Sequence, residues 1–170
     1  MPSDASPRRD LKSNDFSRLA EALRAPEQPL GICRALEQLS AESIGHRLFT
    51  VMRFDDTRDE VQRIHSSLPA HYPVGGRKKK KETAWADRVL REMNVFRGTD
   101  AADIRSVFDD HEKILGLGLG SVLNVPVVFA GRCLGTMNLL HQAGWYEPDD
   151  EGTGALLAAF LIPVLLDDRS

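Results

Sequence analysis

The chain has 170 residues, of which 42% are hydrophobic and 28% charged, and its formal net charge is −3. This length and composition are typical of one soluble globular domain, and the acidic balance argues against a nucleic-acid-binding protein. Two cysteines, Cys33 and Cys133, stand far apart without a CxxC motif, which argues against a zinc site or secreted disulfide framework and favours the cytoplasm.

The N-terminal region is charged and lacks the apolar segment of a signal peptide. We predict that residues 1–12 are disordered and that a first helix covers 13–25, because Phe16, Leu19 and Leu23 recur at helical spacing. Prolines then end this helix.

The rest of the chain alternates between helical periodicity and runs of β-branched and aromatic residues. In chain order the predicted elements are a helix over about 30–43, strands over 47–54 and 61–67, a loop over 68–82, a helix over 83–93, a short strand over 94–98, a helix over 103–115, strands over 121–130 and 132–142, and a helix over 148–167 kinked at Pro163. Two hairpins without regular βαβ alternation indicate an α+β fold with an antiparallel sheet. The longest apolar run, 155–166, is too short for a membrane-spanning helix.

Over residues 27–167 the order of elements and three stretches of sequence resemble a GAF domain. The stretches are RLFTVMRFDDTRDEVQRI, TAWADRVLREMNVFRG and ILGLGLGSVLNVPVVFAGRCLGTMNLLH. The resemblance implies a single domain with a central antiparallel sheet of five or six strands. Helices would pack on one face, and loops and short helices would roof a small-molecule pocket on the other. GAF domains sense ligands or dimerise within signalling proteins, and the fold alone does not identify the ligand.

The resemblance also suggests which side chains border the pocket. We expect ligand contacts from residues on the roofing segments: Tyr72, Thr83, Trp85, Phe96, Asp110 and His111. Two interpretations of Trp85 stay open, because it begins an apolar stripe suited to the core and yet carries an indole N–H that a ligand can use. Asp110 and His111 similarly suit either a ligand contact or a solvated helix face.

A basic run, Arg77–Lys81, precedes the predicted helix at Thr83. It does not match the phosphate-binding pattern GxxxxGK[ST]. One interpretation is a solvated loop. The other is a basic lid over an anion, which the helix N-terminus would help to hold. In that case the anion contacts would come from Lys78, Lys79, Lys80 and Lys81.

Two further motifs are interpreted as structural. Gly116–Gly120 lies after a helix and before a strand, which is the reverse of the order in a dinucleotide-binding fingerprint. The segment Phe108–Glu112 contains residue types that bind metals, but adjacent residues of a helix point in different directions. We therefore expect neither a nucleotide site nor a metal site in these segments.

The sequence predicts a non-catalytic, small-molecule-binding sensory domain in the cytoplasm that needs no cofactor and signals through a separate partner. An alternative is a homodimerisation module with a vestigial pocket, joined through the first helix and an apolar terminal helix carrying Leu156, Leu157, Phe160, Leu161, Val164 and Leu165. A third interpretation is a redox enzyme that uses Cys133, like the GAF-fold proteins that reduce methionine sulfoxide. Because Cys33 falls in a predicted helix and Cys133 in a strand, we expect both to be small buried hydrophobes.

Overall fold

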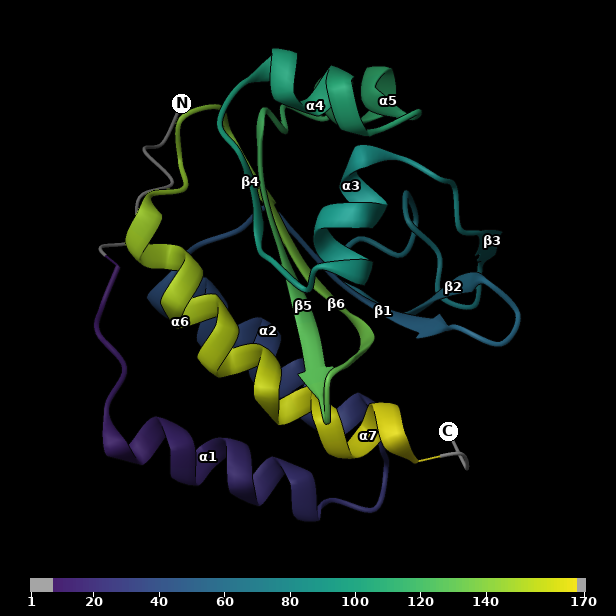
Figure 1. Ribbon diagram of the computed structural model, residues 1–170. Helices are drawn as coiled ribbons and strands as arrows, with labels where there is room; N and C mark the ends of the chain where they lie inside the picture. The colour runs from purple at the N-terminus through teal and green to yellow at the C-terminus, as the bar shows by residue number, and fades with distance from the viewer. Residues whose placement is uncertain (1–7, 168–170) are drawn as a thin grey trace.

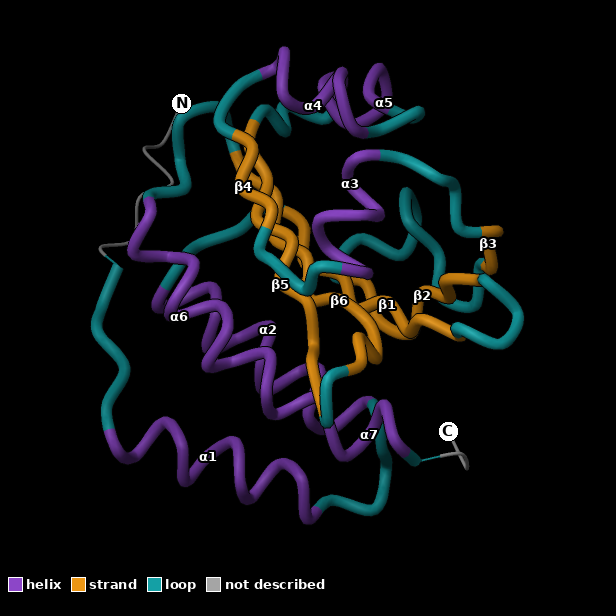
Figure 2. The backbone as a smooth tube through the Cα atoms, viewed as in Figure 1, coloured by secondary structure: helices purple, strands orange, loops and turns teal. Residues whose placement is uncertain are grey.

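A computed structural model describes residues 8–167, which form a six-stranded sheet in the order β3-β2-β1-β6-β5-β4. Every neighbouring pair of strands is antiparallel. The strands are β1 (Leu48–Asp55), β2 (Glu60–Ser66), β3 (Arg77–Lys79), β4 (Phe96–Gly98), β5 (Ser121–Phe129) and β6 (Arg132–His141). The expected α+β fold with an antiparallel sheet of five or six strands is confirmed (Figures 1 and 2).

The helices divide between the two faces of the sheet. Figure 1 shows α2, α6 and α7 on one face with α1 outside them, and α3, α4 and α5 on the opposite side. The helices are α1 (Ser13–Arg24), α2 (Leu30–Ser43), α3 (Ala84–Ala86), α4 (Ala101–Val107), α5 (His111–Gly116), α6 (Pro148–Ala158) and α7 (Ile162–Leu166). None of the helices within residues 8–167 is long and apolar enough to cross a membrane.

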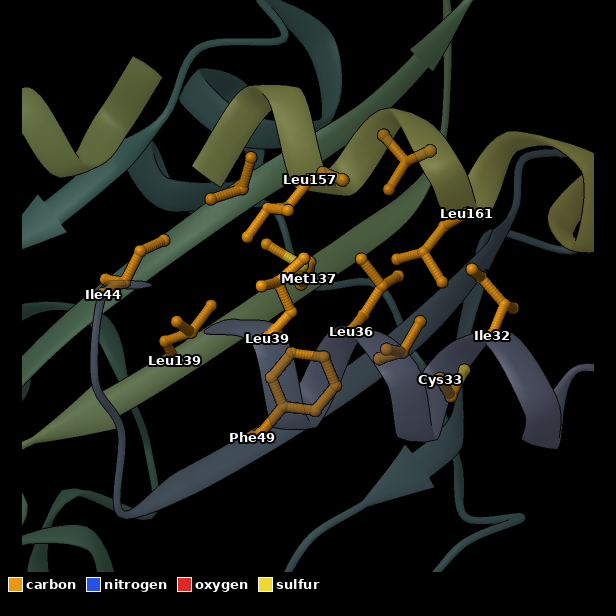
Figure 3. Close-up of a cluster of buried hydrophobic side chains, with 14 of the residues drawn as sticks. Ile32, Cys33, Leu36, Leu39, Ile44, Phe49, Met137, Leu139, Leu157 and Leu161 are labelled. Carbon is orange, nitrogen blue, oxygen red and sulfur yellow. The ribbon is translucent and has the colours of Figure 1, made fainter. Parts of the chain in front are cut away.

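The main hydrophobic core lies between the sheet and the helices α2 and α6 (Figure 3). Phe49 and Met137 project from the strands towards Leu36 of α2 and Leu157 of α6, and all four side chains are fully buried. Burial of one such side chain stabilises a fold by about 1.5–3 kcal/mol. This face of the sheet is therefore filled by core side chains, and a ligand site would have to lie on the other face.

A β-bulge interrupts the pairing of β1 with β2. Val51 lies opposite His65, but the next residue, Met52, lies opposite Arg63, so that Ile64 is an extra residue in β2. Paired residues share a face of the sheet. The bulge therefore places Arg63 on the same face as Met52.

Three predicted elements differ from the structure. The segment 68–82, expected to be a loop, contains β3, which pairs with the edge of β2 and places Lys78 opposite Val61. The helix expected over 103–115 is two helices, since Phe108 between them has extended backbone angles. The helix expected over 83–93 is α3 continued by a π-helical turn over Asp87–Arg91.

The terminal helix also changes its geometry along its length. A 3₁₀ turn at Ala159–Leu161 joins α6 to α7, and Pro163 sits in the first turn of α7, where no N–H donor is needed. The predicted kink at Pro163 is therefore a junction that begins several residues earlier.

Residues 8–12, which we expected to be disordered, are fixed by ion pairs. Arg9 contacts both Asp15 and Glu42, and Arg8 lies 2.8 Å from Asp150 of α6. The arginines supply partners to carboxylates at the start of α1, the end of α2 and the start of α6. Positions 1–7 of the same prediction lie outside the described residues.

Candidate functional site

The face of the sheet opposite the main core carries polar residues on three adjacent strands. Thr50 of β1 pairs with Asn138 of β6, and Met52 pairs with Thr136. On the other side of β6, Asn138 pairs with Asn124 of β5. Because paired residues share a face, these side chains form one floor.

A cavity of about 150 Å³ lies between this floor and a roof of short helices and loops. Trp85 of α3, Tyr72 of the loop after β2, Ile114 of α5, and Phe108 and Asp110 between α4 and α5 line it from above. A cavity of about this volume with apolar walls accommodates benzene. The space therefore suits a molecule of about one ring.

A directed chain of hydrogen bonds runs across the floor. Trp85 Nε1 donates to Asn124 Oδ1 at 2.9 Å, and Asn124 Nδ2 donates to Asn138 Oδ1 at 2.7 Å. Asn138 Nδ2 then donates to the hydroxyl oxygens of Thr50 at 3.2 Å and Thr136 at 3.1 Å. The indole is a donor only, so it fixes the orientation of both amides and makes both hydroxyl oxygens acceptors.

Arg63 and Lys78 bring positive charge to the cavity wall. Arg63 Nη1 donates to the carbonyl oxygen of Pro73 at 3.2 Å, and its Cζ lies 5.2 Å from the centre of the Tyr72 ring. Its Nε is buried and has no hydrogen-bond partner. Burial lowers the pKa of Arg63, yet a guanidinium remains charged at neutral pH.

Three of the residues predicted to contact a ligand line the cavity: Tyr72, Trp85 and Asp110. Burial raises the pKa of Tyr72 to about 12, so its hydroxyl stays protonated at neutral pH and donates to Asp110 Oδ2 at 3.5 Å. Trp85 packs against the cluster of Val89 and Leu90, as the core interpretation expects, and its indole N–H donates to Asn124 of the floor. Ligand contact by these residues stays a prediction.

The other three predicted residues lie outside the cavity lining. Thr83 caps α3 by accepting a hydrogen bond from Ala86 N at 3.1 Å, and it borders an adjoining groove. Phe96 of β4 packs beside the floor opposite Asn124. His111 begins α5, and its buried Nδ1 has no hydrogen-bond partner.

The four lysines of the basic run border one groove beside the cavity, and a lid over an anion stays a prediction. Lys78 and Lys79 are both exposed on β3, and Lys78 also lines the cavity. Lys80 is paired with Asp59 at 3.0 Å, and Lys81 is paired with Asp109. Of the four predicted anion contacts, only Lys78 is placed in the cavity wall.

The residues that the sequence interpretation missed are those of the floor, Thr50, Asn124, Thr136 and Asn138, together with Arg63. A signal was present in β5 and β6, where a single asparagine interrupts each apolar run. An unpaired amide is costly to bury. Two such residues on adjacent strands therefore point to a shared polar site.

Neither cysteine belongs to the cavity lining. Burial raises the pKa of Cys33 to about 12 and also raises the pKa of Cys133. High pKa values disfavour the thiolate needed for nucleophilic or redox chemistry. Among residues 8–167, no group of three metal-binding side chains is close enough to hold an ion.

Most of the terminal-helix side chains that we expected at a dimer interface are instead buried in this chain. Phe160 stacks on Phe16 of α1 with ring centres 6.3 Å apart, and Leu156 is 48% exposed. The buried members are Leu157, Leu161, Val164 and Leu165. These buried side chains are therefore used in packing within this chain.

No protein-family model matches the sequence, and no curated protein matches it. Solved structures do match. A GAF domain from a phosphoenolpyruvate-protein phosphotransferase of Coxiella burnetii is 17% identical, with a TM-score of 0.68, and the alignment covers 92% of this chain and 95% of that one. The corresponding GAF domain from Acinetobacter is 13% identical, with a TM-score of 0.66 and coverage of 91% and 94%.

A third match is the phycocyanobilin-bound GAF domain of a cyanobacterial phytochrome, which is 16% identical with a TM-score of 0.64 and coverage of 91% and 96%. Other similar structures come from a sensor histidine kinase and a methyl-accepting chemotaxis protein. The TM-scores and the coverage show that these structures share the fold of this chain over nearly its whole length. The chain has the fold of a GAF domain.

Proposed function

We propose that this chain is a non-catalytic sensory domain of the cytoplasm that binds one small molecule between the floor and the roof. The observation that carries the proposal is the cavity itself, where an oriented network from Trp85 to Thr50 and Thr136 meets apolar walls. Largely apolar clefts with a few convergent polar groups are typical of small-molecule sites.

The size of the cavity restricts the ligand. Pockets for drug-sized molecules measure about 300–1,000 Å³, whereas this one measures about 150 Å³. A bilin of four rings, as in the cyanobacterial domain, is larger than this cavity taken without the adjoining groove. We therefore propose a ligand of one ring or a short branched chain.

The roof gives the ligand a means of signalling to a partner. Trp85 links α3 to the floor, and Tyr72 links the loop after β2 to Asp110 before α5. A ligand between these groups would favour one arrangement of the roof over others, which is the energetic basis of a sensory response. Similar domains in a histidine kinase and a chemotaxis protein support a role in signal transduction.

A fragment screen by two-dimensional NMR tests the proposal. The chain has two tryptophans, and the indole N–H of Trp145 donates to Ile44 O outside the cavity lining. We expect a bound fragment to shift the indole resonance of Trp85 and to leave that of Trp145 in place. The Trp85→Phe protein assigns the signals. If no fragment in a library of neutral, acidic and basic compounds shifts the Trp85 resonance, the proposal is wrong.

A further inference from the structure

We infer that the ligand is a small organic acid with an apolar body, whose carboxylate is held by Arg63, Lys78 and the hydroxyls of Thr50 and Thr136. This inference rests on the proposed function, because it names the chemical class that the same cavity selects. It follows from the charge, the hydrogen-bonding direction and the shape of the lining.

The charge of the cavity wall favours an anion. Two cations, Arg63 and Lys78, face one carboxylate, Asp110. Neither cation forms an ion pair with any residue in the part of the chain that the structure describes, although Arg97, for example, is paired with Glu151 at 2.9 Å. The wall therefore has a surplus of positive charge.

The geometry of Arg63 favours a carboxylate in particular. Its Nη1 is already used by Pro73 O, while Nε is buried without a partner. A buried donor without an acceptor costs about 1–3 kcal/mol. Arg63 lines the cavity, and a guanidinium has the fork geometry that binds both oxygens of a carboxylate. An acid that reached the edge formed by Nε and Nη2 would satisfy the unpaired donor.

The floor also presents donors rather than acceptors. Asn138 gives its two amide hydrogens to Thr50 and Thr136, so each hydroxyl already accepts. A hydroxyl that accepts one hydrogen bond still has its own proton to donate. Two O–H donors, an ammonium and a guanidinium edge together require a ligand group that only accepts.

The remaining wall is apolar. Leu48 and Leu140 continue the floor on β1 and β6, and Phe108 and Ile114 lie above them. This part would hold the hydrocarbon body of the acid. With about 150 Å³ available, the geometry fits a benzoate-sized or branched short-chain monocarboxylate.

The test compares acids with their uncharged amides. Benzoate and 4-methylpentanoate, each with its primary amide, are titrated into the full chain at pH 7 while the Trp85 indole resonance is followed. We expect each acid to bind at least about tenfold more tightly than its amide, the effect of a charge-assisted hydrogen bond. Arg63→Gln and Lys78→Gln should each weaken the acids by about tenfold and change amide binding by less than about threefold.

Lys79→Gln is the matched control, because this lysine is exposed on the same strand and does not line the cavity. It should leave the affinity for the acids unchanged. Lys78 is exposed, so we expect Lys78→Gln to fold. This variant then measures the effect of the positive charge even if Arg63→Gln does not fold. Equal affinity for acid and amide, or equal losses in the control variant, would overturn the inference while the proposed function stands. If neither acid binds, the inference is wrong, and the fragment screen described above decides separately on the proposed function.

Discussion

The indole Nε1 of Trp85 lies 2.9 Å from Oδ1 of Asn124, and this hydrogen bond joins the roof helix α3 to strand β5 of the floor. Because an indole can only donate, Asn124 must point its oxygen towards Trp85 in the roof and its amide hydrogens towards Asn138. One aromatic residue in the roof thus sets the direction of the hydrogen bonds in the floor.

Replacing Trp85 with Phe keeps most of the aromatic surface and removes the donor. Asn124 is only 2% exposed, so its Oδ1 would be left buried without a donor. We expect the free energy of unfolding, measured with urea, to fall by about 1–3 kcal/mol. Trp145→Phe is the control, because it removes a hydrogen bond to Ile44 O without touching the cavity. Both variants should lose stability, but only Trp85→Phe should lose affinity for a fragment. Unchanged stability in Trp85→Phe would contradict the network.

Gly135 of β6 allows the closest approach of two strands. A Cβ at this position would overlap the carbonyl oxygen of Met52, so Gly135→Ala should lower the free energy of unfolding by more than about 2 kcal/mol. Gly152→Ala is the matched variant. Gly152 lies in α6, and a Cβ at this position would contact no neighbouring atom. Gly152→Ala should stabilise the protein by about 0.5–1 kcal/mol, because Ala is the better helix former. If both substitutions change the free energy of unfolding by similar amounts, the close contact between Gly135 and the carbonyl oxygen of Met52 is wrong.

The two cysteines should be slow to react in the folded protein. The pKa of Cys33 is raised to about 12 by burial, so only a very small fraction is thiolate at pH 8. We expect a thiol reagent such as DTNB to modify Cys33 at the rate of unfolding, and far faster in urea. A protein with both cysteines replaced by Ser should keep its fragment affinity. Rapid native labelling of Cys133, whose pKa burial also raises, would favour the redox interpretation.

The ion pairs near α1 should make stability depend on acidity. Hydrogen bonds from Arg9 and from the backbone N–H of Lys12 hold the pKa of Asp15 below its ordinary value. A carboxyl with a depressed pKa in the folded state stabilises the fold above its unfolded pKa, about 3.9, and this contribution is lost as pH falls further. We therefore expect Asp15→Asn to lower the urea midpoint clearly at pH 7 and progressively less below about pH 4.

Glu21→Gln serves as the control for this pH dependence. Glu21 pairs with Arg24 at 3.7 Å, and both side chains are more than three-quarters exposed. Exposed pairs contribute about 0–1 kcal/mol, so the urea midpoint should change little at any pH. A constant effect of Asp15→Asn between pH 7 and pH 3 would show that the ionised carboxyl is not what stabilises the junction.

The sequence was sufficient to predict those elements whose residues show a clear local pattern. Strands β1, β2, β5 and β6 were predicted to within one or two residues at most ends, because β-branched and aromatic runs and tight turns are local signals. Strand β3 was not predicted. Arg-Lys-Lys has no apolar alternation, and it is a strand only because the edge of β2 offers hydrogen-bond partners. The break at Phe108 was not predicted either, because the apolar residues on both sides of it keep a helical spacing.

The residues of the candidate site show the same difference between local and long-range signals. Roof residues such as Tyr72 and Trp85 were expected because they stand on segments that the GAF resemblance places beside the pocket. Floor residues such as Thr50 and Asn138 become neighbours only through the register of separate strands. Register depends on which residues pair across the sheet, and a single sequence does not display that pairing.

The bulge at Ile64 has a consequence for how the chemistry of this cavity is encoded. In a regular strand, residues two apart lie on the same face, so Arg63 would share a face with His65, which contacts Glu37 of α2. The extra residue Ile64 instead lets Arg63 and His65 face opposite sides of the sheet, with Arg63 opposite Met52. The positive charge of the cavity therefore depends on an irregularity in β2 as well as on the presence of an arginine.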